Sequence, residues 1–116
     1  MIKKEMNSNR KEKIASKVRI LAAEILRDNF REDPIISGVS LVGAQSHGGL
    51  RYVKLFYYTR HDDKNLVRKR LVEITKMVRF ELAQRIDQKY VPDIRFAYDD
   101  TLEKAARIDE LLAKLN

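Results

Sequence analysis

The apolar residues of this chain change their spacing from a helical period to a strand period and back again, twice. A helical period places side chains on one stripe of a helix, whereas alternation places them on one face of a sheet. The first helical stripe, predicted over residues 9–29, consists of Ile14, Val18, Leu21 and Ile25. The candidates for its N-cap are Asn7, Ser8 and Asn9. Asp33-Pro34 ends this helix, because a proline disfavours the helical conformation in the residue before it.

Two strands and a hairpin are predicted after the first helix. Residues 35–45 are rich in β-branched and apolar side chains, and residues 50–59 alternate Val53, Leu55 and Tyr57 with other side chains. Between them, Ser46-His47-Gly48-Gly49 has the length and glycine content of a loop that joins antiparallel neighbours. Gly38 and Gly43 are expected to mark a bulge or a close backbone approach in the first strand.

A second helix is predicted from Asp63 to about residue 88, with Asp62 or Asp63 as its N-cap. Its apolar stripe consists of Val67, Leu71, Ile74, Val78, Leu82 and Ile86. Val72, Met77 and Phe80 fall off this stripe if the helix is straight. We therefore expect a bend or break near Thr75, which would let both halves bury more apolar surface.

A third strand and a closing helix complete the chain. Residues 91–98 alternate apolar and polar side chains, with Pro92 at the start, where a missing N–H is tolerated. Asp100 and Glu103 form a capping pattern before a helix over residues 100–115. Its apolar face consists of Leu102, Ala105, Ile108, Leu112 and Leu115. The order α-β-β-α-(kink)-α-β-α predicts an α+β fold, with a three-stranded mixed sheet and helices on one face.

The chain has 116 residues, and we expect it to form a single domain over residues 1–116, with residues 1–8 flexible. With no Cys and two His, a disulfide framework and a thiolate zinc site are excluded. No apolar run reaches the roughly 18 residues that cross a bilayer, and the start lacks the features of a secretory signal. A cytoplasmic protein without a membrane partner is the expectation.

Positive charge is in excess and unevenly distributed. Lys and Arg number 24 against 17 Asp and Glu, which gives a net charge of +7. Residues 1–30 and 60–90 carry this excess, whereas residues 91–116 are mildly acidic. Such a balance favours a polyanionic partner, although a solvated helix face is the plainer explanation of any one cluster. The candidate RNA-binding residues are Arg10, Lys13, Lys17, Arg68, Lys69, Lys76, Arg79 and Arg85.

Catalytic and metal sites are not supported by the sequence. His47 and His61 lie on predicted loops with no nucleophile elbow nearby, which is typical of solvated histidines. Asp62-Asp63 and Asp99-Asp100 could in principle bind Mg²⁺, as in a nuclease. Both pairs precede predicted helices, however, where carboxylates cap N–H groups. We expect no enzyme activity, no cofactor and no metal.

Aromatic residues cluster in the predicted second strand. They are Tyr52, Phe56, Tyr57 and Tyr58. Aromatic side chains on a sheet can stack on RNA bases, but at strand spacing they more often belong to the core and to cross-strand pairs. We therefore interpret them as structural.

The segment VPDIRFAYDDTL at residues 91–102 is similar to a pattern of the ribosome-binding factor A family. In that pattern a proline and an alternating apolar strand precede an aspartate and a hydroxyl-leucine pair. The resemblance extends over about residues 10–115. Its further support comes from Asp33-Pro34, Val78-Arg79, Leu82-Ala83, Ile108, Leu111 and Leu112. The order and spacing of these pieces together make the match specific.

The resemblance implies a type II KH-like fold. In this family a helix-kink-helix with an Ala-x-Gly replaces the glycine loop with which KH domains grip nucleic acid. Here Ile74-Thr75-Lys76 occupies that position and departs from the pattern. The hairpin departs too, because Ser46-His47-Gly48-Gly49-Leu50 carries two inserted residues where the family usually has an aspartate.

The resemblance also implies a function. Members of the family are non-catalytic assembly factors that bind the immature small (30S) ribosomal subunit and its 16S rRNA, near the 5′ end and the decoding region. A monomer that assists late maturation, with assembly GTPases as possible partners, is therefore expected. The alternatives are a generic KH-like single-stranded RNA-binding protein, a protein-interaction adaptor without RNA binding, and a small metal-dependent nuclease.

Overall fold

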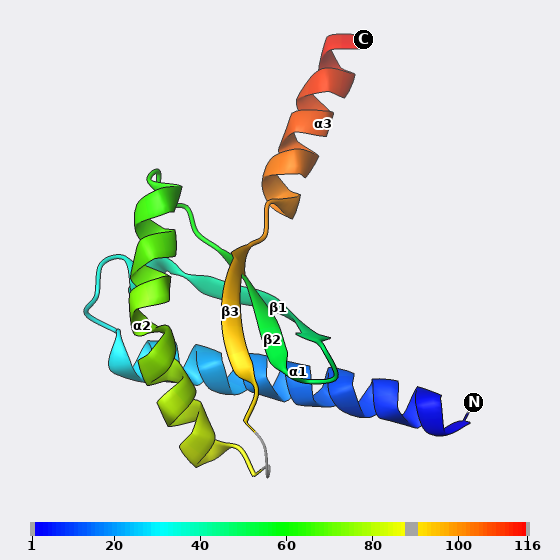
Figure 1. The fold of residues 1–116 in the computed structure, drawn as a ribbon. Helices are drawn as coiled ribbons and strands as arrows, with labels where there is room; N and C mark the ends of the chain where they lie inside the picture. The colour runs from blue at the N-terminus through cyan, green and yellow to red at the C-terminus, as the bar shows by residue number, and fades with distance from the viewer. Residues whose placement is uncertain (1, 88–90, 116) are drawn as a thin grey trace.

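The computed structural model describes residues 2–87 and 91–115 (Figure 1). Its elements, in chain order, are α1 (Ile2–Asn29), the short 3-10 helix η1 (Ile36–Gly38), β1 (Ser40–His47), β2 (Tyr52–Tyr58), α2 (Lys64–Arg85), β3 (Asp93–Tyr98) and α3 (Thr101–Leu115). Within these residues, none of the helices is both long enough and apolar enough to span a membrane.

The three strands form one mixed sheet in the order β1-β2-β3. β1 pairs with β2 antiparallel, and β2 pairs with β3 in parallel. The parallel pair is possible because α2 carries the chain from the end of β2 back to the start of β3. The predicted α+β fold with a mixed three-stranded sheet is confirmed.

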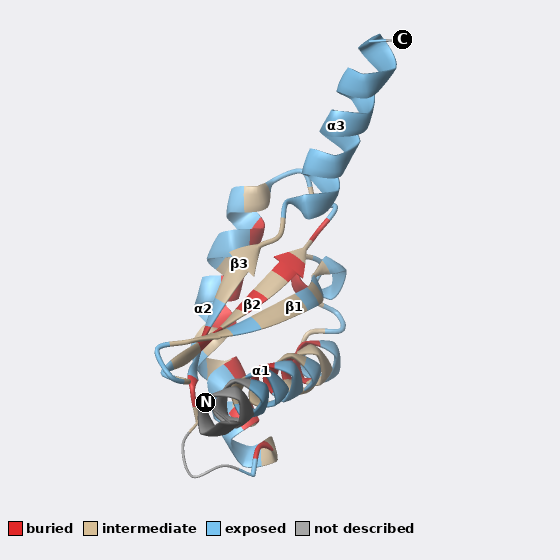
Figure 2. Ribbon diagram, turned by 90° about the vertical axis from the view of Figure 1, so that its right-hand side faces the viewer, coloured by how far each residue is buried: buried red, intermediate tan, exposed pale blue. Residues whose placement is uncertain are grey.

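The core lies between one face of the sheet and the helices α1 and α2. Along β2, Val53, Leu55 and Tyr57 are buried while the residues between them are half-buried. The helices contribute Ala15, Val18, Ala22, Ile25, Leu26, Val67, Leu71, Ile74, Val78 and Leu82. These positions confirm the two predicted helical stripes. In Figure 2, α2 lies behind the strands and the colours alternate along β2.

The ends of α1 and of β1 differ from the prediction. α1 already begins at Ile2, so the predicted cap residues 7–9 lie inside the helix. The first strand was predicted over residues 35–45, but it begins only at Ser40, because residues 36–38 form η1. The reason is local, because the Asp33 carboxylate accepts hydrogen bonds from the backbone N–H groups of Ile35 and Ile36, at 2.8 and 3.0 Å.

The hairpin turn is shifted toward the second strand. Ser46 and His47 belong to β1, and His47 is paired with Tyr52. The turn itself consists of residues 48–51, in which the φ angles of Gly48, Gly49 and Leu50 are all positive. Glycine adopts this conformation readily, so the two glycines allow the tight reversal. The register also shifts between Leu41 and Gly43, so Gly43 lies at a bulge as predicted, whereas Gly38 lies in η1.

The sequence predicts a bend or a break near Thr75; α2 is one continuous helix, so a break there is wrong, whereas a bend is present (Figure 1). Figure 1 shows its axis changing direction near the middle without interruption. The Thr75 hydroxyl donates a hydrogen bond to the Leu71 carbonyl at 2.7 Å, an interaction that often bends helices slightly. This curvature does not bury the off-stripe side chains, because Val72 and Phe80 remain 65 % and 62 % exposed.

α3 does not cover the sheet, contrary to the prediction that the helices share one face. Figures 1 and 2 show it projecting from the end of β3, away from α1 and α2. All its residues are exposed. The large apolar side chains on it, each at least 55 % exposed, are Leu102, Ile108, Leu111, Leu112 and Leu115. The apolar face of this helix was predicted correctly. The sheet was expected to cover that face, and it does not.

The predicted cap of α3 is also corrected. Asp99, not Asp100, accepts a hydrogen bond from the Thr101 backbone N–H, at 3.0 Å, and it also accepts one from the Thr101 hydroxyl. These two hydrogen bonds lower the pKa of Asp99. Glu103 does not reach back to the helix start, because its carboxylate accepts the Tyr98 hydroxyl at 2.6 Å. Burial, followed by this contact, raises the pKa of Tyr98.

Removal of α3 should leave the rest of the fold nearly as stable as before. Its polar contacts with α2 and β3 are those of Glu103 with Lys64 and Tyr98, and exposed pairs of this kind contribute less than about 1 kcal/mol. We expect a chain that ends at Asp100 to unfold at nearly the same urea concentration as the full chain, measured by circular dichroism. A strongly lowered midpoint would mean that α3 packs on the core.

Two valines of α2 provide a matched test of the continuous helix. Val78 is fully buried, so Val78→Ala should lower the free energy of unfolding by about 2 kcal/mol. Val72 points to solvent, so Val72→Ala should change it by less than about 0.5 kcal/mol. Urea denaturation measures both. Equal losses in the two variants would contradict the exposed position of Val72.

Candidate nucleic-acid interface

The exposed side of α2, opposite its buried residues, carries a row of cationic and apolar side chains. We call this row the α2 stripe, and its residues are Arg68, Lys69, Val72, Lys76, Arg79 and Phe80. Asp63 fixes the start of the helix, because its carboxylate accepts the Leu66 backbone N–H at 3.0 Å. The predicted cap at this position is confirmed. Packing of the opposite side on the core holds the stripe toward solvent.

Three cations of the α2 stripe have no carboxylate partner within the described part of the chain. They are Arg68, Lys69 and Lys76. Arg79 differs, because its Nε lies 3.0 Å from the Asp93 carboxylate and its guanidinium donates to the Val91 carbonyl. Arg79 therefore ties α2 to the start of β3, and the other three are available to bind an anion.

Arg85 is separated from the α2 stripe. It lies on the side of α2 that faces α1, with its guanidinium 3.7 Å from Asp28 and 3.9 Å from Glu81. Two acidic neighbours reduce the attraction of this group for phosphate. The structure thus gives Arg85 a place between the two helices and does not bring it together with the other predicted residues.

Arg70 contributes to the fold and not to the stripe. Its guanidinium contacts the Asp33 carboxylate at 2.8 Å and Glu73 at 3.1 Å. The Ile36 backbone N–H lowers the pKa of Asp33 most, and the hydrogen bond from Arg70 adds to this effect while burial opposes it. Asp33 thereby joins the end of α1, the start of η1 and α2.

A second group of predicted residues lies on α1. Arg10, Lys13 and Lys17 are exposed, and Ile20 follows them on the same side of the helix. None of the three cations pairs with a carboxylate among the side chains of residues 9–87 and 91–115. Figure 1 shows this end of α1 pointing away from α2, which lies beside the other end. The predicted site is therefore two separate basic surfaces.

Sequence reasoning missed the apolar members of the α2 stripe. Phe80 and Val72 were expected to be buried, yet both are exposed between cations, with Lys76 one helical turn from each. An exposed aromatic ring beside Lys and Arg is typical of surfaces that bind single-stranded nucleic acid. The signal in the sequence was their position off the apolar stripe, among basic residues.

The aromatic residues of β2 divide between two faces. Tyr57 is buried, as predicted, and burial raises its pKa. Tyr52, Phe56 and Tyr58 alternate with the buried residues and therefore point to the face of the sheet that α1 and α2 do not cover. We call this uncovered side the open face of the sheet.

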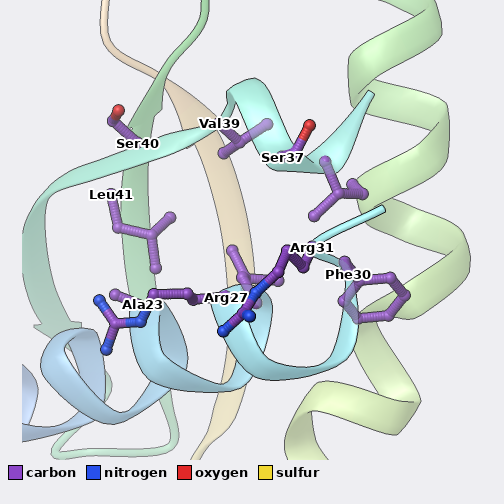
Figure 3. A pocket seen from close by; sticks show the side chains of 10 residues that line it. Ala23, Arg27, Phe30, Arg31, Ser37, Val39, Ser40 and Leu41 are labelled. Atoms are coloured by element: carbon purple, nitrogen blue, oxygen red, sulfur yellow. The ribbon is translucent and has the colours of Figure 1, made fainter. Parts of the chain in front are cut away.

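The fold also contains a hollow of about 310 Å³ between the end of α1 and the start of β1 (Figure 3). Its lining consists of Ala23, Leu26, Arg27, Phe30, Arg31, Ile36, Ser37, Val39, Ser40 and Leu41. These residues supply mostly apolar walls and two cations. They include no carboxylate, histidine or cysteine, so the hollow carries no acid–base pair for catalysis.

The remaining candidate groups have local structural roles. His61 accepts the Asp63 backbone N–H through Nδ1, at 3.0 Å. His47 was expected on a loop but lies in β1, where its ring stacks on Tyr52 at 4.9 Å. Across the described ranges, no three His, Asp or Glu side chains form a group that could hold a metal ion.

Comparison with known proteins gives consistent matches. The family model described as Ribosome-binding factor A matches residues 10–112. A protein named Ribosome-binding factor A from Coxiella burnetii is 32 % identical over 92 % of this chain and 90 % of its own length. One from Natranaerobius thermophilus is 28 % identical over 96 % and 86 %. The crystal structure of ribosome-binding factor A from Thermus thermophilus has a similar fold, with a TM-score of 0.66 over 76 % of this chain and 94 % of that chain, at 14 % identity.

The Asp33 contact predicts a specific pH dependence. Because the pKa of Asp33 is lowered in the folded state, its stabilising effect is fully present above its unfolded pKa of about 4 and is lost as the pH falls further. Asp33→Asn should lower the free energy of unfolding by about 1 kcal/mol at pH 7. The difference from the unchanged protein should shrink below about pH 4. Urea denaturation at several pH values measures it, and a difference that does not shrink at all as the pH falls below about 4 would contradict the role of the charge.

Proposed function

Because the chain belongs to the ribosome-binding factor A family, we propose that it is a non-catalytic assembly factor for the small (30S) ribosomal subunit. In this proposal it binds immature subunits through their 16S rRNA, near the 5′ end and the decoding region, and assists late maturation. Residues 1–116 act as one domain, as a monomer in the cytoplasm. Assembly GTPases are the partners that we propose for its release.

The observation that supports RNA binding most directly is the α2 stripe. Arg68, Lys69 and Lys76 project from one rigid helix with no carboxylate partner among the described residues. Binding a phosphate backbone releases condensed counterions, so several such cations supply substantial affinity. A helix also fixes their spacing, which lowers the entropy cost of binding.

An assembly factor must discriminate between states of its target. A ligand that binds immature and mature subunits equally cannot shift the balance between them, however tightly it binds. The proposed mechanism therefore requires rRNA in the immature subunit to fit the basic surfaces of α1 and α2 better than mature rRNA does. Two separate basic surfaces can supply this discrimination, because both engage only when the RNA segments have the right relative placement.

A generic single-stranded RNA-binding protein is the second candidate. The observation that favours it is Phe80, which is exposed on the α2 stripe beside cations and can stack on any base. The two candidates differ in their competitors. Unrelated single-stranded RNA should displace a generic binder from small subunits, whereas an assembly factor should remain bound.

Neutralising the α2 stripe should weaken binding to small subunits. The variant is the triple substitution Arg68→Gln, Lys69→Gln and Lys76→Gln. Each phosphate contact contributes about 0.9 to the slope of log affinity against log salt concentration, so we expect the slope to fall by two to three. Co-sedimentation with immature small subunits at several salt concentrations measures affinity and slope together.

A matched control removes three cations elsewhere. The triple substitution Lys104→Gln, Arg107→Gln and Lys114→Gln changes the net charge equally on α3, in the acidic part of the chain. It should leave binding and salt slope nearly unchanged. Equal losses in both triple variants would mean that net charge, and not the α2 stripe, governs binding. Unaltered binding in both would contradict the assigned site.

A further inference from the structure

The open face of the sheet has the composition of a binding surface. Along β2 it presents Tyr52, Lys54, Phe56 and Tyr58, each half-buried, on the side opposite the core. Its cross-strand neighbours include Arg95 of β3, which is exposed. Aromatic side chains and cations therefore alternate on a surface that neither α1 nor α2 covers.

Phe56 lies at the centre of this face between the smallest available neighbours. In the sheet register it is paired with Gly43 on β1 and with Ala97 on β3. The ring leans toward the glycine, because a Cβ built on Gly43 would lie 3.7 Å from Phe56 Cδ2. A Cβ on Gly43 would therefore make only an ordinary van der Waals contact with the ring. Because neither neighbour has a side chain larger than a methyl group, neither of them covers the ring.

The two cations on the open face lie close enough to repel each other. Lys54 and Arg95 are direct cross-strand partners, and like charges in that arrangement destabilise a sheet. Neither forms an ion pair within the described residues. The carboxylate on the same face, Asp93, is bound to Arg79. An anion lying between the two cations would remove the repulsion.

The cations are also held close to the aromatic rings. The Arg95 guanidinium lies 3.9 Å from the centre of the Tyr52 ring, and His47 stacks on the same ring at 4.9 Å. Lys54 Nζ lies 6.0 Å from the centre of the Phe56 ring. This arrangement fixes positive charge next to the half-buried Phe56 ring, and single-stranded nucleic acids are bound through aromatic rings and cations together.

We propose that the open face binds single-stranded RNA, with one base stacked on Phe56 and the adjoining phosphate between Lys54 and Arg95. This inference rests on the proposed RNA-binding function and adds a third contact surface to those on α1 and α2. The α2 stripe offers RNA only positive charge and one exposed ring on a helix. The open face would instead require an unpaired base, because a base in a duplex cannot lie flat on the sheet.

The experiment compares base stacking with phosphate binding in the full chain. The probes are an unstructured RNA of about ten nucleotides that contains 2-aminopurine, and an abasic oligonucleotide with the same backbone. Phe56→Leu keeps an apolar side chain but removes the ring, and Phe56→Tyr keeps the ring. Phe30→Leu is the matched control, because Phe30 is a half-buried ring beside the hollow of Figure 3.

We expect Phe56→Leu to weaken binding of the base-containing RNA about tenfold and to abolish the quenching of 2-aminopurine fluorescence. Its binding of the abasic probe should be unchanged. Phe56→Tyr and Phe30→Leu should bind as the unchanged protein does. The double substitution Lys54→Gln and Arg95→Gln should weaken binding of both probes and lower the salt slope by about two. Thermal unfolding of each variant checks that it is folded.

Several outcomes would overturn the inference. Normal RNA binding by Phe56→Leu, or equal weakening with both probes, would exclude stacking on Phe56. Loss of subunit binding without loss of RNA binding would make the open face a protein-docking surface. If the unchanged protein bound neither probe nor small subunits, the proposed function would fail together with the inference, whereas binding that depends only on the α2 stripe would overturn the inference alone.

Discussion

The one-sided burial of β2 is the constraint on which the rest of this structure depends. Val53, Leu55 and Tyr57 are buried under α1 and α2, and alternation then forces Lys54 and Phe56 to the opposite side of the sheet. The same packing turns the polar sides of both helices toward solvent. There Lys13, Lys17, Arg68, Lys69 and Lys76 have no carboxylate partner among the described side chains. The surfaces that we propose to bind RNA are therefore consequences of a single core.

The corner at Asp33 shows how a few polar contacts set the geometry of that core. The Asp33 carboxylate accepts two backbone N–H groups of η1 and binds Arg70 of α2, so the exit of α1 is fixed relative to the second helix. Arg85 adds a contact between α2 and Asp28 near the same end of α1. In both contacts an arginine is paired with a carboxylate inside the fold. From composition alone, these arginines would have been counted as part of a basic surface. Charge that stabilises the fold is thus separated from charge that is available to a partner.

Periodicity predicted every α-helix and strand that the structure describes, but not η1, because each of these longer elements needs a regular apolar pattern to bury one side. It could not predict which other element would pack on each apolar face. The leucines of α3 have a clear helical spacing yet remain exposed, and Val72 and Phe80 stayed on the surface because α2 curves without breaking. The basic residues were recognised, but sequence distance could not show that Arg79 and Arg85 face carboxylates from other elements. RNA stacking on the aromatic residues of β2 was considered, but they were interpreted as structural, because a strand pattern does not reveal whether the second side of the sheet is covered.

The positions of the α2 stripe and the open face limit how RNA can bind. The stripe lies on the solvent side of α2, and the ion pair between Arg79 of the stripe and Asp93 of the open face joins the two surfaces at the β3 edge of the sheet. An RNA strand that contacts both surfaces would pass around this edge, whereas two separate RNA segments, one on each surface, would be held by the chain at a fixed separation. In either case binding depends on the relative placement of the bound RNA, because the fold fixes the positions of the two surfaces.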